Sequence, residues 1–142
     1  MDTIEAILTR RSIRAFTSEE ISDPDLDILL NAGMAAPSAN NKQPWHFVVV
    51  RERDTLQRIK MIHPYAAMAD TAAVGLIVCG DSELEDVQGY LSVDCAAATQ
   101  NILLAAHANG LGAVWCGIFP REHRMEAFRK LFDLPDHVMP VS

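Results

Sequence analysis

A short run of basic residues stands out in an otherwise acidic chain. Arg10, Arg11 and Arg14 are three of the twelve Lys and Arg residues, and they fall within five positions around Ser12. Guanidinium groups bind phosphate through paired hydrogen bonds, and a serine hydroxyl adds a neutral donor. The run, called here the arginine turn (residues 10–14), indicates an anion pocket. Taken alone, a solvated basic turn paired with surface carboxylates explains it more simply.

A second polar group lies in the stretch Pro37-Ser38-Ala39-Asn40-Asn41-Lys42-Gln43, just before an apolar segment. Amide side chains both donate and accept hydrogen bonds, as recognition of a heteroaromatic ring requires. Loops that precede buried strands often carry binding residues. Turn chemistry alone also accounts for Asn, Ser and Pro here. This stretch is called the amide loop (residues 37–43), and its composition leaves both interpretations open.

A third candidate is the glycine segment (residues 112–118), Gly-Ala-Val-Trp-Cys-Gly-Ile. Glycine at the end of a buried strand lets backbone N–H groups approach a planar ligand closely. A strand end with Trp115 in the core is an equally good reading. Gly110 and Gly112 form no dinucleotide fingerprint, because they follow a helix and open a strand. The sequence shows no catalytic triad and no metal motif, and Cys116 has no adjacent base to activate it.

The elements that must position these groups follow from apolar spacing and capping residues. Asp2 caps a helix that ends near Arg10, and Ser22 or Asp23 caps a second helix with Pro24 in its first turn. The pattern then predicts strands at 46–50, 74–79, 112–119 and from 138, with helices at 54–62, 87–109 and after Pro120. Helices interleave with strands, so the fold class is α/β or α+β with a sheet covered by helices.

Composition limits the function classes. The chain has 142 residues, a net charge of −7 and 22% charged residues, which predicts one globular domain and disfavours a general nucleic-acid surface. The uncharged stretch 95–120 is interrupted by polar residues and glycines, so we expect no membrane span. The N-terminus lacks the pattern of a signal peptide, and the three cysteines are odd in number and widely spaced. We therefore expect a cytoplasmic protein with free thiols and no metal.

Taken together and in this order, the motifs resemble those of the FMN-dependent nitroreductases. They are the Arg-Arg-Ser-Ile-Arg turn, the loop Ala-Pro-Ser-Ala-Asn-Asn-Lys-Gln-Pro-Trp-His-Phe, the helix from Gln100-Asn101 to Gly110-Leu111-Gly112, and Trp115-Cys116-Gly117. The resemblance covers essentially the whole chain. It implies an α+β fold, a three-layer α/β/α sandwich with a mixed, mainly antiparallel sheet. It also implies an obligate homodimer with FMN at the subunit interface.

The resemblance assigns roles to individual residues. The arginine turn would hold the phosphate, the ribityl chain and the N1/C2 edge of the flavin, through Arg10, Arg11, Ser12 and Arg14. The amide loop would reach the same flavin from the partner subunit, through Pro37, Ser38, Ala39, Asn41 and Gln43. The glycine segment would give backbone contacts to N5 and O4, through Cys116, Gly117 and Ile118.

The implied function is transfer of hydride from NADH or NADPH, through flavin N5, to a small-molecule oxidant such as a nitroaromatic or a quinone. No protein nucleophile is needed, because the cofactor carries the chemistry. A same-fold flavin enzyme with dehalogenase or flavin-fragmenting chemistry stays open, as does a non-catalytic dimeric flavin-binding or sensor protein.

Two features depart from the family pattern. Residues 66–69 offer no lysine before the second strand, and the chain ends at Ser142, inside an expected strand. We therefore expect an incomplete C-terminal strand and weaker FMN binding than in relatives that continue further.

Overall fold

A computed structural model describes residues 1–142. Its sheet has three strands in the order β1 (Trp45–Val50), β2 (Gly75–Asp81) and β3 (Val138–Pro140). Both pairings are antiparallel. Trp45 lies opposite Gly80, and Cys79 lies opposite Pro140. The sheet is therefore antiparallel throughout, whereas the resemblance implies a mixed, mainly antiparallel sheet.

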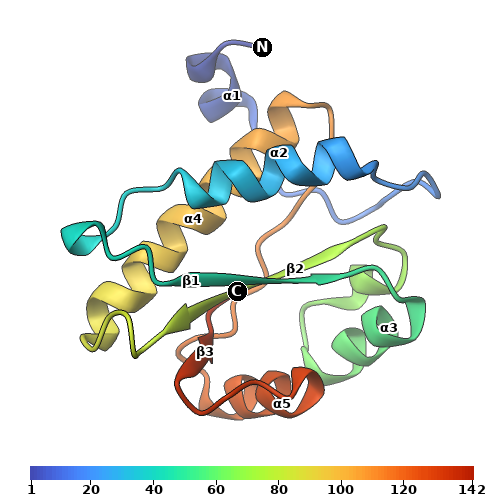
Figure 1. Ribbon diagram of the computed structural model, residues 1–142. Helices are drawn as coiled ribbons and strands as arrows, with labels where there is room; N and C mark the ends of the chain where they lie inside the picture. The colour runs from blue at the N-terminus through green and yellow to red at the C-terminus, as the bar shows by residue number, and fades with distance from the viewer.

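Helices cover both faces of this sheet, which gives three layers (Figure 1). One layer holds α1 (Thr3–Thr9), α2 (Asp23–Met34) and α4 (Gln88–Ala108), and the other holds α3 (Arg53–Ile62) and α5 (Glu122–Phe132). Two short 3₁₀ helices, η1 (Ala39–Asn41) and η2 (Ala67–Asp70), lie in connecting loops. This arrangement confirms the α+β class and the helix-covered sheet.

The two N-terminal helices begin where their capping residues predict. The Asp2 carboxylate accepts a hydrogen bond from the Glu5 N–H at 2.9 Å, and the Ser22 hydroxyl accepts one from the Asp25 N–H at 3.2 Å. Each bond satisfies a backbone donor that the first turn leaves free. The Gly110 backbone has φ +75°, the left-handed conformation expected directly after α4. These local signals were sufficient to place the ends of the helices.

The strand predicted at 112–119 is wrong. These residues belong to no helix and to no sheet. Their only backbone bonds outside the local turn join Ala113 to Ile13, and Ile118 and Phe119 to Val141. A strand needs a neighbour that pairs with several successive residues, and here one residue is bonded at one end and two at the other. The glycine segment is therefore an irregular segment that no strand pairs with.

Helix α4 packs against β2 at a point where β2 has no side chain. A Cβ added at Gly80 would lie 2.6 Å from Cγ of Leu91 and 3.1 Å from Sγ of Cys95. Both of those residues are buried. The close approach of helix and strand therefore depends on glycine at this position.

We expect Gly80→Ala to lower the free energy of unfolding by about 1–3 kcal/mol, because the added methyl group overfills a packed contact. Urea unfolding of the two proteins measures this. Gly89→Ala is the matched control, since nothing lies within 4 Å of a Cβ there and alanine favours a helix. Equal midpoints for Gly80→Ala and the parent protein would contradict the packing account.

No helix of the structure combines the length and the apolar character needed to cross a membrane. Cys79, Cys95 and Cys116 are all free thiols, as the sequence predicts.

Candidate functional site

The arginine turn docks onto the glycine segment. The Ile13 N–H donates to the Ala113 carbonyl at 3.0 Å, and a Cβ added at Gly112 would lie 2.8 Å from Cγ2 of Ile13. Two groups separated by about 100 residues in sequence are thereby brought together. Gly112 has to be glycine for this contact, because any side chain would push the turn away.

Two guanidinium groups of the arginine turn differ in whether the chain already binds them. Nη1 of Arg11 donates to the Leu8 and Arg10 carbonyls at 3.1 and 2.9 Å, so this guanidinium folds back on the end of α1. Arg14 is exposed, and neither a hydrogen bond nor an ion pair holds its side chain. Its charge partly offsets the burial that raises the pKa of the Cys116 thiol. Arg14 is therefore a free cation beside the glycine segment.

The glycine segment presents free backbone donors. No hydrogen bond within the chain uses the N–H of Cys116 or Gly117. The N–H of Ile118 is different, because it donates to the Val141 carbonyl at 3.0 Å and its residue is 1% exposed. The resemblance also assigns Ile118 a backbone contact to the flavin, but the Ile118 N–H is already used within the chain. Cys116 and Gly117 remain as the two donors.

The amide loop is held in an unusual backbone conformation. Asn40, Asn41 and Gln43 have φ of 52°, 55° and 49°, in the left-handed region that few residues other than glycine adopt. The Ser38 hydroxyl accepts from the Gln43 N–H at 2.9 Å, and the buried Asp94 carboxylate accepts from the Ala39 N–H at 3.1 Å. Strain of this kind gathers at binding sites, where surrounding contacts enforce it.

The amide loop and the arginine turn lie apart within one chain. The loop attaches to the N-terminal half of α4 through Asp94, whereas α1 attaches to its C-terminal end, where Thr9 and His107 are hydrogen-bonded at 2.9 Å. Figure 1 shows η1 and α1 at opposite ends of α4. The resemblance assigns the loop and the turn of one flavin site to different subunits, and within one chain they lie toward opposite ends of α4.

The glycine segment and the amide loop each adjoin a separate hollow. A mostly apolar cavity of about 380 Å³ lies between β2 and the glycine segment, and Gly75, Ala113 and Cys116 are among its walls. A shallower hollow of about 400 Å³ lies beside the amide loop, where Gln43 and His46 meet apolar side chains. Neither hollow includes a residue of the arginine turn.

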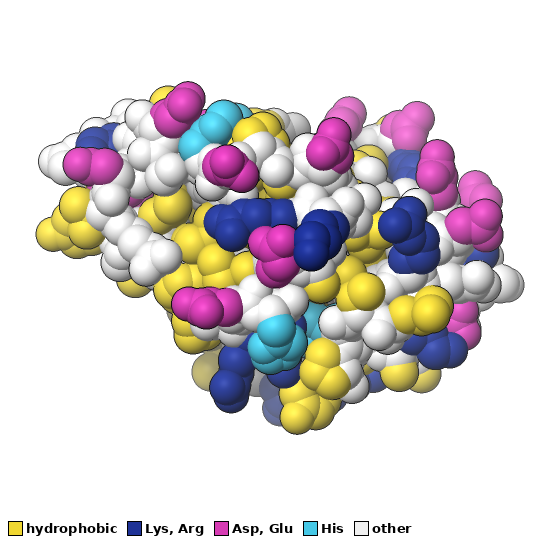
Figure 2. All heavy atoms as spheres, turned by 90° about the horizontal axis from the view of Figure 1, so that it is seen from below, with side chains coloured by type: hydrophobic (Ala, Val, Ile, Leu, Met, Phe, Trp, Pro, Cys, Tyr) yellow, Lys and Arg dark blue, Asp and Glu magenta, His cyan; other side chains and the backbone are white.

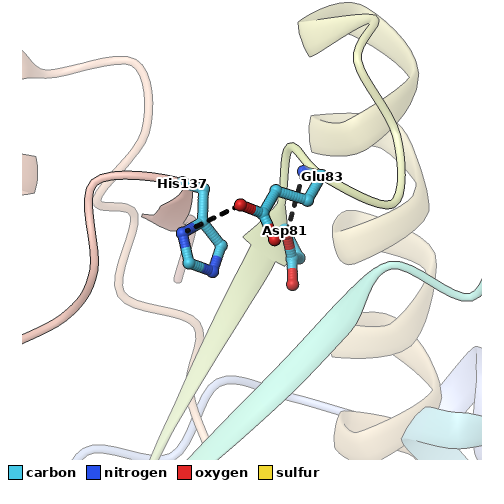
Figure 3. Close-up of side chains that lie close together, drawn as sticks. All are labelled: Asp81, Glu83 and His137. Carbon is cyan, nitrogen blue, oxygen red and sulfur yellow. Dashed lines mark hydrogen bonds and ion pairs between the residues drawn. The ribbon is translucent and has the colours of Figure 1, made fainter.

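A cluster that the sequence analysis missed lies at the end of β2 (Figure 3). Asp81, Glu83 and His137 each offer one possible metal-ligand atom, and these atoms lie within 4.8 Å of one another. Nε2 of His46 also lies 2.8 Å from the Asp81 carboxylate. Burial raises the pKa of Asp81, but hydrogen bonds from His46 and the Glu83 N–H, with the charge of His137, outweigh it and leave that pKa below its usual value. The cluster ties β1, β2 and the segment before β3 together, and no sequence spacing pointed to it.

His63 is a second residue that no pattern in the sequence marks. Its side chain is 2% exposed and its Nε2 lies 2.7 Å from the Gly117 carbonyl, inside the candidate site. Burial lowers the pKa of His63, and the nearby charge of Arg124 adds to the effect. The ring is therefore neutral at pH 7.

The lowered pKa of His63 predicts a loss of stability in mild acid. The unfolded chain takes up a proton near the ordinary pKa of 6.5, before the folded chain does, so the free energy of unfolding falls as pH drops below that value. Urea unfolding at pH 7 and pH 5 measures the fall. His63→Gln removes the titrating group, so the free energy of unfolding of this variant should fall less between pH 7 and pH 5. An equal loss in both proteins would contradict the prediction.

The face covered by α3 and α5 carries both signs of charge. Figure 2 shows Lys and Arg side chains interspersed with Asp and Glu among apolar groups there, without a continuous basic surface. The candidate site residues come instead from the turn after α1, the amide loop and the glycine segment.

Comparisons with known proteins show which family the chain belongs to. The family model described as the nitroreductase family matches residues 7–73 and 61–141. A protein of Methanothermobacter thermautotrophicus, provisionally named NADH dehydrogenase/NAD(P)H nitroreductase, is 52% identical over all of this chain and 74% of its own length. A crystal structure of a provisionally named NADH dehydrogenase/NAD(P)H nitroreductase from Parabacteroides distasonis has a TM-score of 0.94 at 40% identity, over 98% of this chain and 82% of the other.

A crystal structure from Desulfovibrio desulfuricans, provisionally named a nitroreductase, was solved in complex with FMN. It has a TM-score of 0.85 and 33% identity, over 97% of this chain and 81% of that one. The family match spans nearly the whole chain, and the folds superimpose over nearly the same residues. This chain belongs to the nitroreductase family.

Proposed function

We propose that the protein is an NAD(P)H-dependent oxidoreductase that binds FMN and passes hydride to a small oxidant such as a quinone or a nitroaromatic. The observation that carries this proposal is the docking of the arginine turn onto the glycine segment through the Ile13–Ala113 hydrogen bond. It places a free guanidinium beside two free backbone N–H groups. FMN needs this combination, because it has one phosphate and a ring edge that accepts hydrogen bonds.

The residues present fit the cofactor by their chemistry. Arg10, Arg14 and the hydroxyl of Ser12 offer donors for the phosphate and ribityl chain, and Arg11 adds positive charge at the end of α1. The N–H groups of Cys116 and Gly117 offer donors to N5 and O4. When bound, the flavin would supply the hydride chemistry at N5. The chain's own part is to bind, orient and polarise the ring.

Positive charge near the N1/C2 edge would favour the more electron-rich form of the ring. Arg14 is the group best able to provide it, because its side chain is not engaged elsewhere and its charge acts on Cys116 in the glycine segment. Cys116 takes no chemical part, because burial keeps its thiol protonated at neutral pH. We therefore assign no catalytic side chain.

We further propose that the protein is a homodimer with FMN between the subunits. The amide loop sits at one end of α4 and the arginine turn near the other end. If two copies of α4 pack antiparallel about a two-fold axis, the loop of one chain meets the turn of the other. Pro37, Ser38, Ala39, Asn41 and Gln43 would then complete the site of the partner subunit.

The exposed apolar side chains support this pairing. Tyr90 and Val93 on α4 are 54% and 64% exposed, and Ala97, Gln100 and Leu104 continue the same face at helical spacing. On α1, Ile4, Ile7 and Leu8 are all exposed. Grouped apolar side chains of this kind mark association surfaces.

The test of the proposed function is cofactor binding by the purified protein. FMN should bind at micromolar concentration or below and FAD more weakly, because the arginine turn offers a single phosphate pocket and the chain shows no adenine site. Quenching of flavin fluorescence measures both dissociation constants. Tighter binding of FAD than of FMN, or no binding of either, would contradict the proposal.

A further inference from the structure

The carbonyl of Gly117 is held by two side chains from distant parts of the chain. Nε2 of His63 lies 2.7 Å from this oxygen, and Nη1 of Arg124 donates to it at 3.0 Å. A carbonyl oxygen has two lone pairs, and both are used here. At the other end of the same peptide group, the Ile118 N–H donates to Val141. The peptide between Gly117 and Ile118 is therefore fixed at both ends.

His63 is fixed as well. Its Nδ1 accepts a hydrogen bond from the Tyr65 N–H at 3.1 Å, so the ring proton of the neutral imidazole lies on Nε2 and is donated to Gly117. The edge of the ring packs against Phe128, with ring centroids 6.2 Å apart at 85°. Both nitrogens are satisfied, and the side chain is almost completely buried. The histidine therefore has one orientation and one tautomer.

Arg124 approaches the same oxygen from the first turn of α5. Its guanidinium lies 5.4 Å from the centre of the Tyr65 ring, a cation–π contact that helps to hold it. Its Nε is buried and has no acceptor. A buried donor without a partner costs free energy, so the fold keeps this guanidinium in place despite a penalty.

The neighbouring peptide group needs such an anchor. The N–H groups of Cys116 and Gly117 have no partner in the chain, and nothing lies within 4 Å of a Cβ placed on Gly117. Glycine with open space around it rotates freely unless its backbone is held. The bonds from His63 and Arg124 to the Gly117 carbonyl, called here the carbonyl clamp, are the contacts that can stop this rotation.

We propose that His63 and Arg124 are positioning residues, which aim the N–H groups of Cys116 and Gly117 at the redox edge of FMN. This inference rests on the proposed function. Donors that are oriented before the reaction stabilise the charge that develops without having to reorganise. Arg124 also brings a half-buried positive charge to the same place, which favours the reduced cofactor. The clamp thus affects the flavin without touching it.

The experiment compares variants of the FMN-loaded protein. His63→Leu and Arg124→Met remove one clamp bond each, whereas His63→Gln and Arg124→Lys keep a donor. Three quantities are measured for each variant: the flavin midpoint potential, the FMN dissociation constant and the rate of flavin reduction by NADH in stopped flow. The matched control is Arg129→Met on the same helix, where Nε of Arg129 donates to the Val138 carbonyl at 3.4 Å, outside the glycine segment.

We expect His63→Leu and Arg124→Met to slow reduction about 10- to 100-fold, the effect of a small misplacement at a reacting centre. The midpoint potential should become more negative, most clearly in Arg124→Met. His63→Gln and Arg124→Lys should recover most of the rate, and the FMN dissociation constant should change much less than the rate. Arg129→Met should match the parent protein in all three quantities.

The outcomes separate the clamp from the proposed function. If the parent protein binds FMN and is reduced by NADH but Arg124→Met behaves like Arg129→Met, the clamp is wrong and the function stands. A parent protein that does not bind FMN overturns both. If His63→Leu fails to fold, the pair Arg124→Met and Arg124→Lys still decides: equal potentials and rates in these two variants would overturn the proposal.

Discussion

Replacing Arg14 with alanine should weaken FMN binding by about 10- to 150-fold. Arg14 is exposed, adjoins the glycine segment and has no other partner, so its guanidinium is available to the phosphate or to the carbonyl edge of the ring. A hydrogen bond to a charged group contributes about 1.5–3 kcal/mol. Tenfold in affinity corresponds to about 1.4 kcal/mol. Titration of the apoprotein with FMN, followed by flavin fluorescence, measures the change.

Arg58→Ala is the matched control for this variant. Arg58 is an exposed arginine on α3, in the layer opposite α1. The net charge changes equally in both variants, so any difference in affinity reflects position and not total charge. Equal dissociation constants for the two variants would return the arginine turn to the simpler interpretation, a solvated basic turn.

Val93→Asp should convert the proposed dimer into a monomer and abolish tight FMN binding together. Val93 is 64% exposed and lies on α4 next to Asp94, which holds the amide loop. A charge in the centre of an apolar interface loses its water without gaining a partner. Each FMN would then lose the amide loop that the partner subunit supplies. Light scattering at micromolar concentration and FMN titration measure both losses.

Met61→Asp is the matched control for the dimer prediction. Met61 is 83% exposed on α3, on the opposite face of the sheet, so the same chemical change falls outside the proposed interface. Ile102, by contrast, is 7% exposed and packs against Gly33 within the subunit, so its replacement would test folding instead. A Val93→Asp protein that stays dimeric, or that binds FMN as a monomer with unchanged affinity, would contradict the shared site.

Local signals in the sequence predicted most of the elements. Capping by Asp2 and Ser22 and the left-handed Gly110 depend on neighbouring residues, so the sequence shows them directly. The strand expected at 112–119 failed for the opposite reason. Apolar, β-branched composition favours an extended backbone, but only a pairing partner makes a strand. No other segment of the folded chain pairs with 112–119 over several residues.

The candidate site also contains some residues that the sequence predicts and others that only the structure reveals. The arginine turn, the amide loop and the glycine segment were visible as compositions, and the structure joins the first to the third through Ile13. His63 and Arg124 were not visible, because one is a lone histidine after a helix and the other one arginine among several. Only the folded chain places both on the Gly117 carbonyl. The hydrogen bond from the Ile118 N–H to the Val141 carbonyl was likewise visible only in the tertiary structure.

The most direct test of the central claim is anaerobic reduction of the FMN-loaded protein. NADH or NADPH is added under nitrogen, the visible flavin absorbance is followed, and a quinone is added afterwards. The account predicts one FMN per chain, bleaching by the nicotinamide cofactor and recovery of the absorbance with the quinone. Bound FMN that neither cofactor bleaches would contradict it and indicate a flavin-binding protein without this activity.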